Sequence, residues 1–168
     1  PILDGTHVTP TADLFIREDG HGLLYRGKVH SFYGASESGK SWLAQIACAA
    51  LLQDGKTVTY IDFESDARDV VDRLLALGIN RHAIAGGFTY IRPEGPRDVT
   101  DPAWHALLAS RPALIVIDGV TEALTMWGGE TKDNDAITRW MRQFPRAVAS
   151  ATGAAVVTID HVTKDKES

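Results

Sequence analysis

The chain has 168 residues, of which 44% are hydrophobic, enough for one buried core and too few for two comfortable domains. Its 17 lysines and arginines face 22 aspartates and glutamates, and the net charge of −5 excludes the overall basic surface of a non-specific nucleic-acid binder. No apolar run approaches the roughly 20 residues needed to span a bilayer, and the first residues lack the pattern of a signal peptide. These features predict a soluble cytoplasmic protein with no membrane partner.

Residues 1–27 are predicted to be an N-terminal extension with a short hairpin. A small apolar patch covers residues 14–16, and residues 22–25 have the pattern of a strand that turns into another strand at 29–33. Residues 28–168 are predicted to form the main domain.

A glycine-rich turn follows the strand at 29–33 and precedes a helix. Residues 34–41 have the Walker A pattern GxxxxGKS, whose glycines let successive backbone N–H groups point inward and cradle phosphates. Lys40 is expected to reach the β- and γ-phosphates, and the Ser41 hydroxyl is expected to ligate Mg²⁺. A carboxylate inside this loop would repel its ligand, so Glu37 is expected to point outward. The predicted nucleotide-binding residues are Gly34, Ala35, Ser36, Glu37, Ser38, Gly39, Lys40, Ser41 and Trp42.

Strands and helices alternate after this turn. A β-branched and aromatic run at 57–63 predicts a strand that ends at Glu64. Asp66 can cap the next helix, whose apolar residues recur at helical spacing up to a stop at Gly78. Residues 88–91 have the pattern of a short strand, and a helix is predicted after the proline-rich loop that follows.

The second half of the chain continues the alternation. Residues 113–118 form an unbroken apolar run that ends in an acid, the Walker B pattern of a parallel strand covered on both faces. A polar stretch at 125–134 leads to a predicted helix over 135–152, bent at Pro145, and residues 155–160 predict another buried strand. The sequence therefore predicts an α/β fold, with a mostly parallel sheet flanked by helices on both faces.

Parallel strands bring their carboxyl ends to one rim, and ligands bind there. Glu64, Asp118 and His161 follow three strands on the same rim as the Walker A loop. Phosphoryl transfer to water needs neutralised charge, a metal ion and a group that orients the water. The predicted catalytic residues are Lys40, Glu64, Asp118 and His161, with Ser41 and Asp118 as metal ligands. Asp62 is the alternative to Glu64, and His161 could equally be a histidine satisfied by neighbouring backbone groups.

The polar stretch after the Walker B strand holds the candidate contact with DNA or with a second subunit. Trp127 lies beside two glycines with Lys132 nearby, so single-stranded nucleic acid could stack on its ring or a neighbouring subunit could bury it. The other tryptophans are expected to be core or interface residues, and Cys48 a small buried hydrophobe.

Four motifs follow one another along the chain: the Walker A loop, Glu64, Asp118 and a final strand that leads into His161 and Lys164. This set of motifs resembles RecA-fold ATPases, most closely the RepA/DnaB-like branch of phage and bacterial replication proteins. The resemblance implies that Glu64 is the catalytic glutamate, that His161 senses the γ-phosphate, and that nucleotide binds between subunits of a hexameric ring or filament. It also implies that two segments grip single-stranded DNA, the loop at roughly 125–134 after the Walker B strand and the segment that begins at Val162 and contains Lys164. A finger residue normally follows, so the core is expected to be truncated at its C-terminal end.

The resulting prediction is magnesium-dependent ATP binding and hydrolysis that drives a DNA helicase, translocase or recombination protein of a bacterium or a phage-infected cell. One alternative is a nucleotide-switched regulatory or assembly ATPase that does not translocate. Another is a P-loop small-molecule kinase, which typically needs an arginine-rich lid that the sequence does not show.

Overall fold

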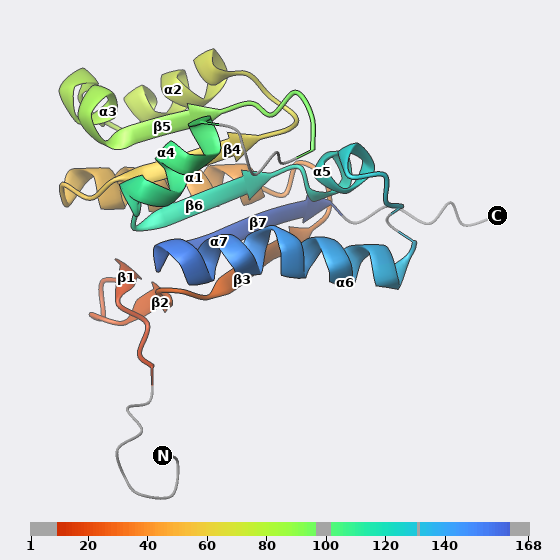
Figure 1. Ribbon diagram of the computed structural model, residues 1–168. Coiled ribbons are helices and arrows are strands. Elements are labelled where there is room, and N and C mark those ends of the chain that lie inside the picture. The colour runs from red at the N-terminus through yellow and green to blue at the C-terminus, as the bar shows by residue number, and fades with distance from the viewer. Residues whose placement is uncertain (1–9, 97–101, 131, 162–168) are drawn as a thin grey trace, which may run out of the picture.

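The computed structural model describes residues 10–96, 102–130 and 132–161 (Figure 1). Its centre is a five-stranded sheet in which all neighbouring strands are parallel, in the order β3–β7–β6–β4–β5. These strands are β3 (Val29–Gly34), β4 (Val58–Asp62), β5 (Phe88–Ile91), β6 (Leu114–Asp118) and β7 (Ala155–His161). A separate antiparallel hairpin joins β1 (Leu14–Ile16) to β2 (Gly22–Leu24).

Helices cover both faces of the sheet (Figure 1). The helices on one face are α1 (Lys40–Gln53), α2 (Ala67–Ala76) and α3 (Arg81–Gly87). Those on the other are α4 (Pro102–Ser110), α5 (Val120–Met126), α6 (Asn134–Gln143) and α7 (Pro145–Thr152). The longest, α1, has 14 residues, and none of the helices in the described ranges is long and apolar enough to span a bilayer. The predicted α/β fold is confirmed.

The central strands β4 and β6 are buried along their whole length because both of their faces are covered. All residues of β4 and β6 are buried, as expected for parallel strands between two helical layers. Tyr60 and Val116 belong to the core on the α1 side, whereas Ile61 and Ile117 belong to the core on the α7 side. Side-chain direction therefore alternates along each strand, and this alternation decides which rim residues face α1.

The helix predicted over 135–152 is two helices. The bend expected at Pro145 is a full break, because Phe144 has φ −120° and ψ −80° and belongs to neither α6 nor α7. Pro145 occupies the first turn of α7, where the missing N–H costs no intrahelical hydrogen bond.

Two further features differ from the sequence prediction. Two short helices, α3 and α5, were not anticipated, and Asn80 caps α3 by accepting a hydrogen bond from Ala83 N at 2.8 Å. The strand predicted at 22–25 is β2, which pairs with β1 in the hairpin, and a turn leads from it into β3 as predicted. Gly27 separates β2 from β3: it has φ +66°, and its N–H donates to the carbonyls of Gly153 and Ala154, both at 3.0 Å.

The two motif-bearing strands are not neighbours in the sheet. β7 lies between β3, which leads into the glycine-rich turn, and β6, which ends at Asp118. It pairs in parallel with both of them. All the strands end at the same edge of the sheet, where α5 also begins (Figure 1).

Candidate active site

The turn from β3 into α1 is curled by residues in the left-handed region. Glu37 has φ +61° and Gly39, the N-cap of α1, has φ +86°. Such alternation of backbone conformation points successive N–H groups into one concavity, which suits an anion. Gly34 avoids a tight contact, since a Cβ there would come within 3.2 Å of Ser38 Oγ. Glu37 is exposed, in line with the expected outward direction.

Lys40 closes the inside of this turn. Its Nζ donates to Gly34 O at 2.8 Å and to Ala35 O at 2.6 Å, and it lies 3.4 Å from Ser38 Oγ. The residue is 8% exposed. These partners are neutral, and none of the ion pairs found among the described residues involves Lys40. A buried ammonium group is thus held in the loop by neutral hydrogen-bond partners.

Two carboxylates lie side by side at the ends of β4 and β6. Asp62 and Asp118 are Cα partners in the parallel register, and they are 0% and 3% exposed. Tyr60 and Val116, two residues earlier, face α1, so both carboxylates belong to the same layer as the Walker A helix. The Tyr60 hydroxyl donates to Asp118 Oδ2 at 2.5 Å.

Burial raises the pKa of Tyr60, and the adjacent Asp118 carboxylate raises it further, so the hydroxyl remains a donor at physiological pH. The Gln45 amide approaches this hydroxyl from α1 and acts on the same pKa in the opposite direction. Ser41 is one turn before Gln45, on the same face of α1. Ser41 and Asp118 therefore face a common space between the helix and the sheet.

Glu64 is held in a turn that Asp62 builds. Asp62 Oδ1 accepts hydrogen bonds from Glu64 N at 2.9 Å and Ser65 N at 2.8 Å. The Glu64 side chain is exposed and packs over Gly119, where a Cβ would be 3.0 Å from Glu64 Cγ. This contact places Glu64 beside the residue that follows Asp118. The geometry therefore favours Glu64 over Asp62 as the group available to water.

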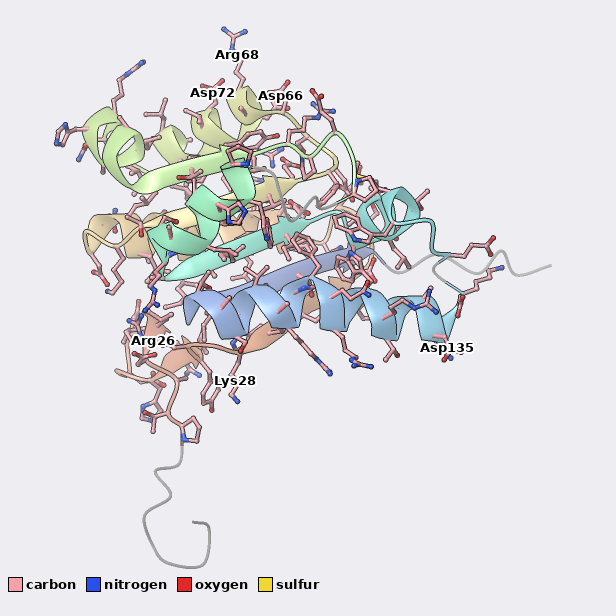
Figure 2. All side chains as sticks on the ribbon, viewed as in Figure 1. Arg26, Lys28, Asp66, Arg68, Asp72 and Asp135 are labelled. Atoms are coloured by element: carbon pink, nitrogen blue, oxygen red, sulfur yellow. The ribbon has the colours of Figure 1, made fainter. Side chains whose placement is uncertain are left out.

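The helix after this turn begins where the sequence predicted. Asp66 Oδ1 accepts from Arg68 N at 2.8 Å and from Asp69 N at 3.1 Å, which makes it the N-cap of α2 (Figure 2). The cap fixes the end of the segment that carries Glu64.

His161 is placed by the backbone of β7. In the β3–β7 register it is the partner of Gly34, the first residue of the phosphate loop. The strand therefore delivers position 161 to the edge of the predicted nucleotide site. Lys164 lies outside the described residues.

Residues 17–167 match the family described as AAA domain. The chain belongs to this family. It is also similar to the DNA repair protein RadA of Brucella abortus (strain 2308), with 29% identity over 153 residues, which cover 89% of this chain and 31% of RadA. The chain thus spans about a third of the length of that relative. With its parallel sheet and Walker A turn, this AAA domain is a RecA-like P-loop ATPase domain. Its place in the RepA/DnaB-like branch stays a prediction.

Trp127 of the AAA domain is packed against other aromatic rings. Its ring stacks on Phe144 at a centroid distance of 5.2 Å and meets the edge of Phe63 at 6.4 Å. Half-buried there, Trp127 is part of the core on the α7 side. Lys132 is exposed just before the N-cap of α6. The two residues lie in the segment between α5 and α6.

Trp42 is in the first turn of α1 but turns its ring toward α2. It is 43% exposed, and the Arg73 guanidinium carbon lies 5.5 Å from the ring centroid, a cation–π contact. Its contribution to the phosphate loop would therefore come from the backbone N–H, which belongs to the first turn of the helix.

Three residues of the AAA domain site were not singled out from the sequence. Tyr60 has no distinguishing signal, because an aromatic residue is ordinary in a buried strand. Gln45 does have one, since it is the sole polar side chain within residues 42–52. Gly119 directly follows the Walker B aspartate with φ +93° and leaves room for Glu64.

Proposed function

We propose that this AAA domain binds ATP at the loop formed by residues 34–41 and hydrolyses it with Mg²⁺. The observation that carries the proposal is the buried Lys40 ammonium group, bonded to the loop carbonyls Gly34 O and Ala35 O. A triphosphate would exchange neutral partners of Lys40 for charged ones, and charge-assisted hydrogen bonds are the stronger kind. The N-terminus of α1 favours the same negative charge.

The residues present also suit a magnesium ion. The Ser41 hydroxyl and the Asp118 carboxylate are the hard oxygen donors that Mg²⁺ prefers, with water and phosphate oxygens as the remaining ligands. Support for this pairing comes from the place of Asp118 at the end of β6, in the layer of α1, and from the place of Ser41 in the first turn of α1, on the same face as Gln45. When bound, the ion neutralises charge that develops on the phosphate oxygens during transfer.

Glu64 is proposed to orient the attacking water. Its carboxylate is exposed at the rim, while its backbone is fixed by Asp62 and its side chain rests on Gly119. A base or water-positioning group must reach solvent at the rim, and Asp62 is fully buried beneath the turn. Lys40 would stabilise the negative charge that develops, and His161 would contact the γ-phosphate from the end of β7.

We further propose that turnover drives movement on DNA, in the manner of RepA/DnaB-like helicases or of recombination proteins. Similarity to a protein named for DNA repair supports this assignment. The working form would be a hexameric ring or filament in the cytoplasm of a bacterium or an infected host cell. Trp127, Lys132 and Lys164 are the proposed contacts with single-stranded DNA or with a neighbouring subunit.

A second candidate is a nucleotide-dependent switch that does not translocate. The packing of Trp127 on Phe144 and Phe63 favours it, because the ring is then committed to the core and leaves less surface for a base to stack on. In that case the loop after β6 would report the state of the nucleotide to a protein partner.

One titration separates these functions. ATP hydrolysis by the purified protein is measured as phosphate release with and without single-stranded DNA, beside the Lys40→Ala variant. We expect turnover that requires Mg²⁺, rises several-fold with DNA and is lost in the variant. Turnover indifferent to DNA would favour the switch. A protein that neither binds nor cleaves ATP would refute the proposal, and phosphate transfer that needs an acceptor other than water would indicate a kinase.

A further inference from the structure

A buried hydrogen bond joins Tyr60 to the Walker B aspartate. The Tyr60 hydroxyl donates to Asp118 Oδ2 at 2.5 Å, at the short end of the range for a hydroxyl bonded to an ionised carboxylate. Tyr60 is 0% exposed, so water does not compete for the hydroxyl. The bond links residues that are 58 positions apart in the sequence.

The surrounding structure fixes the hydroxyl in one place. Tyr60 is the middle residue of β4, which pairs with β5 on one side and with β6 on the other. Its ring packs in the core below α1 and meets the Phe88 ring at a centroid distance of 6.5 Å. A tyrosine ring has few rotatable bonds, so a ring held in this way delivers its hydroxyl to a defined point.

The same point is in contact with the helix that follows the phosphate loop. Gln45, a buried residue of α1, interacts with the Tyr60 hydroxyl from the helix side. One turn earlier on the same face is Ser41, the proposed second metal ligand. The hydroxyl is therefore placed where α1, β4 and the end of β6 meet.

We propose that Tyr60 is a positioning residue that fixes the Asp118 carboxylate in the orientation required to hold Mg²⁺ opposite Ser41. A carboxylate has about four lone-pair directions, so the bond at Oδ2 restrains rotation and leaves acceptor capacity for the ion or its water shell. Hydrogen bonds behind a ligating carboxylate set its orientation and basicity, and their loss typically costs roughly 10- to 100-fold in metal affinity. This inference rests on the proposed function.

The alternative is that the tyrosine only fills the core. Tyr60→Phe distinguishes the two roles, because it keeps the ring and removes the hydroxyl. A filling role predicts unchanged metal binding. A positioning role predicts a loss confined to the part of nucleotide binding that depends on Mg²⁺.

The experiment is an equilibrium titration of a fluorescent ATP analogue at a series of Mg²⁺ concentrations, and it does not depend on turnover. For Tyr60→Phe we expect about a 10-fold rise in the Mg²⁺ concentration needed for half-maximal tight binding. Binding in the presence of a chelator should be unchanged. Tyr25→Phe is the matched control, because Tyr25 stacks on His30 beside the hairpin and should titrate as the wild type does.

A double-mutant cycle tests whether Tyr60 acts through Asp118. In an Asp118→Asn background, Tyr60→Phe should have almost no further effect on the Mg²⁺ requirement. An equal loss in both backgrounds would overturn the inference, as would a Tyr60→Phe protein with the wild-type requirement. A wild-type protein whose nucleotide binding ignores Mg²⁺ would instead overturn the proposed function, and the inference with it.

The thermal stability of the variants is an independent test of the interaction between Tyr60 and Asp118. Tyr60→Phe leaves a buried charge with one hydrogen bond fewer, and Asp118→Asn removes that charge. If Tyr60→Phe alone is too unstable to titrate, the double variant should regain thermal stability. A double variant as unstable as the single one would mean that the hydroxyl does not act on the carboxylate, which would overturn the inference.

Discussion

Replacing Gly119 with alanine tests whether the position of Glu64 matters for catalysis. Gly119 follows Asp118 with φ +93° and ψ +64°, a conformation that residues with a Cβ rarely adopt. A Cβ built there would be 3.0 Å from Glu64 Cγ and 3.1 Å from both Phe63 Cβ and Glu122 Oε2. The substitution therefore strains the backbone and displaces the side chain proposed to orient water.

Two contributions set the loss of folding stability expected for Gly119→Ala. The left-handed conformation costs an alanine about 1–2 kcal/mol. The Glu64 and Glu122 side chains are exposed and can move aside, but the Phe63 Cβ is tied to the backbone, so we add about 1 kcal/mol for overpacking. At about 2–4 °C per kcal/mol for a domain of this size, a total of about 2–3 kcal/mol lowers Tm by roughly 4–12 °C.

Gly153→Ala is the matched control for Gly119→Ala. Gly153 also has a left-handed φ, +75°, but a Cβ there would meet nothing within 4 Å, and the residue ends α7 away from the rim. It should lose about 1–2 kcal/mol of stability and keep its ATPase rate. Gly119→Ala should lose at least about 10-fold in the rate and bind nucleotide normally, because only the water-orienting group is misplaced.

The assays are thermal unfolding, phosphate release and binding of a fluorescent nucleotide, each on both variants. A Gly119→Ala protein with the wild-type rate would refute the role given to Glu64. Equal loss of rate in Gly153→Ala would show that the effect comes from lower stability and not from the displaced carboxylate.

The other predictions concern single side chains of the site and the core. Lys40→Ala should abolish tight nucleotide binding, measured by fluorescence titration; wild-type affinity would remove the phosphate-loop assignment. Glu64→Gln should still bind ATP and cleave it at least about 100-fold more slowly, whereas Asp62→Asn should mainly lower Tm; the reverse pattern would exchange their roles. Burial raises the pKa of the Cys48 thiol from 9.0 to about 12, so stability due to the protonated thiol is present below pH 9 and is lost as the pH rises towards 12. A Cys48→Ala variant should lack that part of the alkaline fall in Tm; an identical pH profile would contradict it.

Features that depend only on residues close together in the sequence could be predicted. The strand predicted at 88–91 is β5, and the run that ends at Asp118 is β6 with one residue fewer at its start. The N-cap at Asp66 also agrees with the structure. In each case the signal is a contiguous apolar run or a capping side chain, and no distant contact is needed to interpret it.

Features that depend on distant contacts could not be predicted. The bond between Tyr60 and Asp118 exists only because β4 and β6 pair in one register. The break at Phe144 accompanies the packing of its ring against Trp104, Trp127 and Trp140, which come from three different segments. Helical periodicity continues across the break, so pattern alone indicates one helix.

The place of β7 between β3 and β6 limits the kinds of motion that can connect these two motif-bearing strands. The register pairs its residues with β3 on one side and β6 on the other, and Val157 and Ile159 fill the α1 side while Val156 fills the opposite side. Sliding by a single residue would turn each of these side chains into the wrong layer, at the cost of both cores. A force applied at His161, the end of β7, would therefore twist or bend this strand without sliding it. Because β7 pairs with both β3 and β6, such a distortion would move the phosphate loop and Asp118 together.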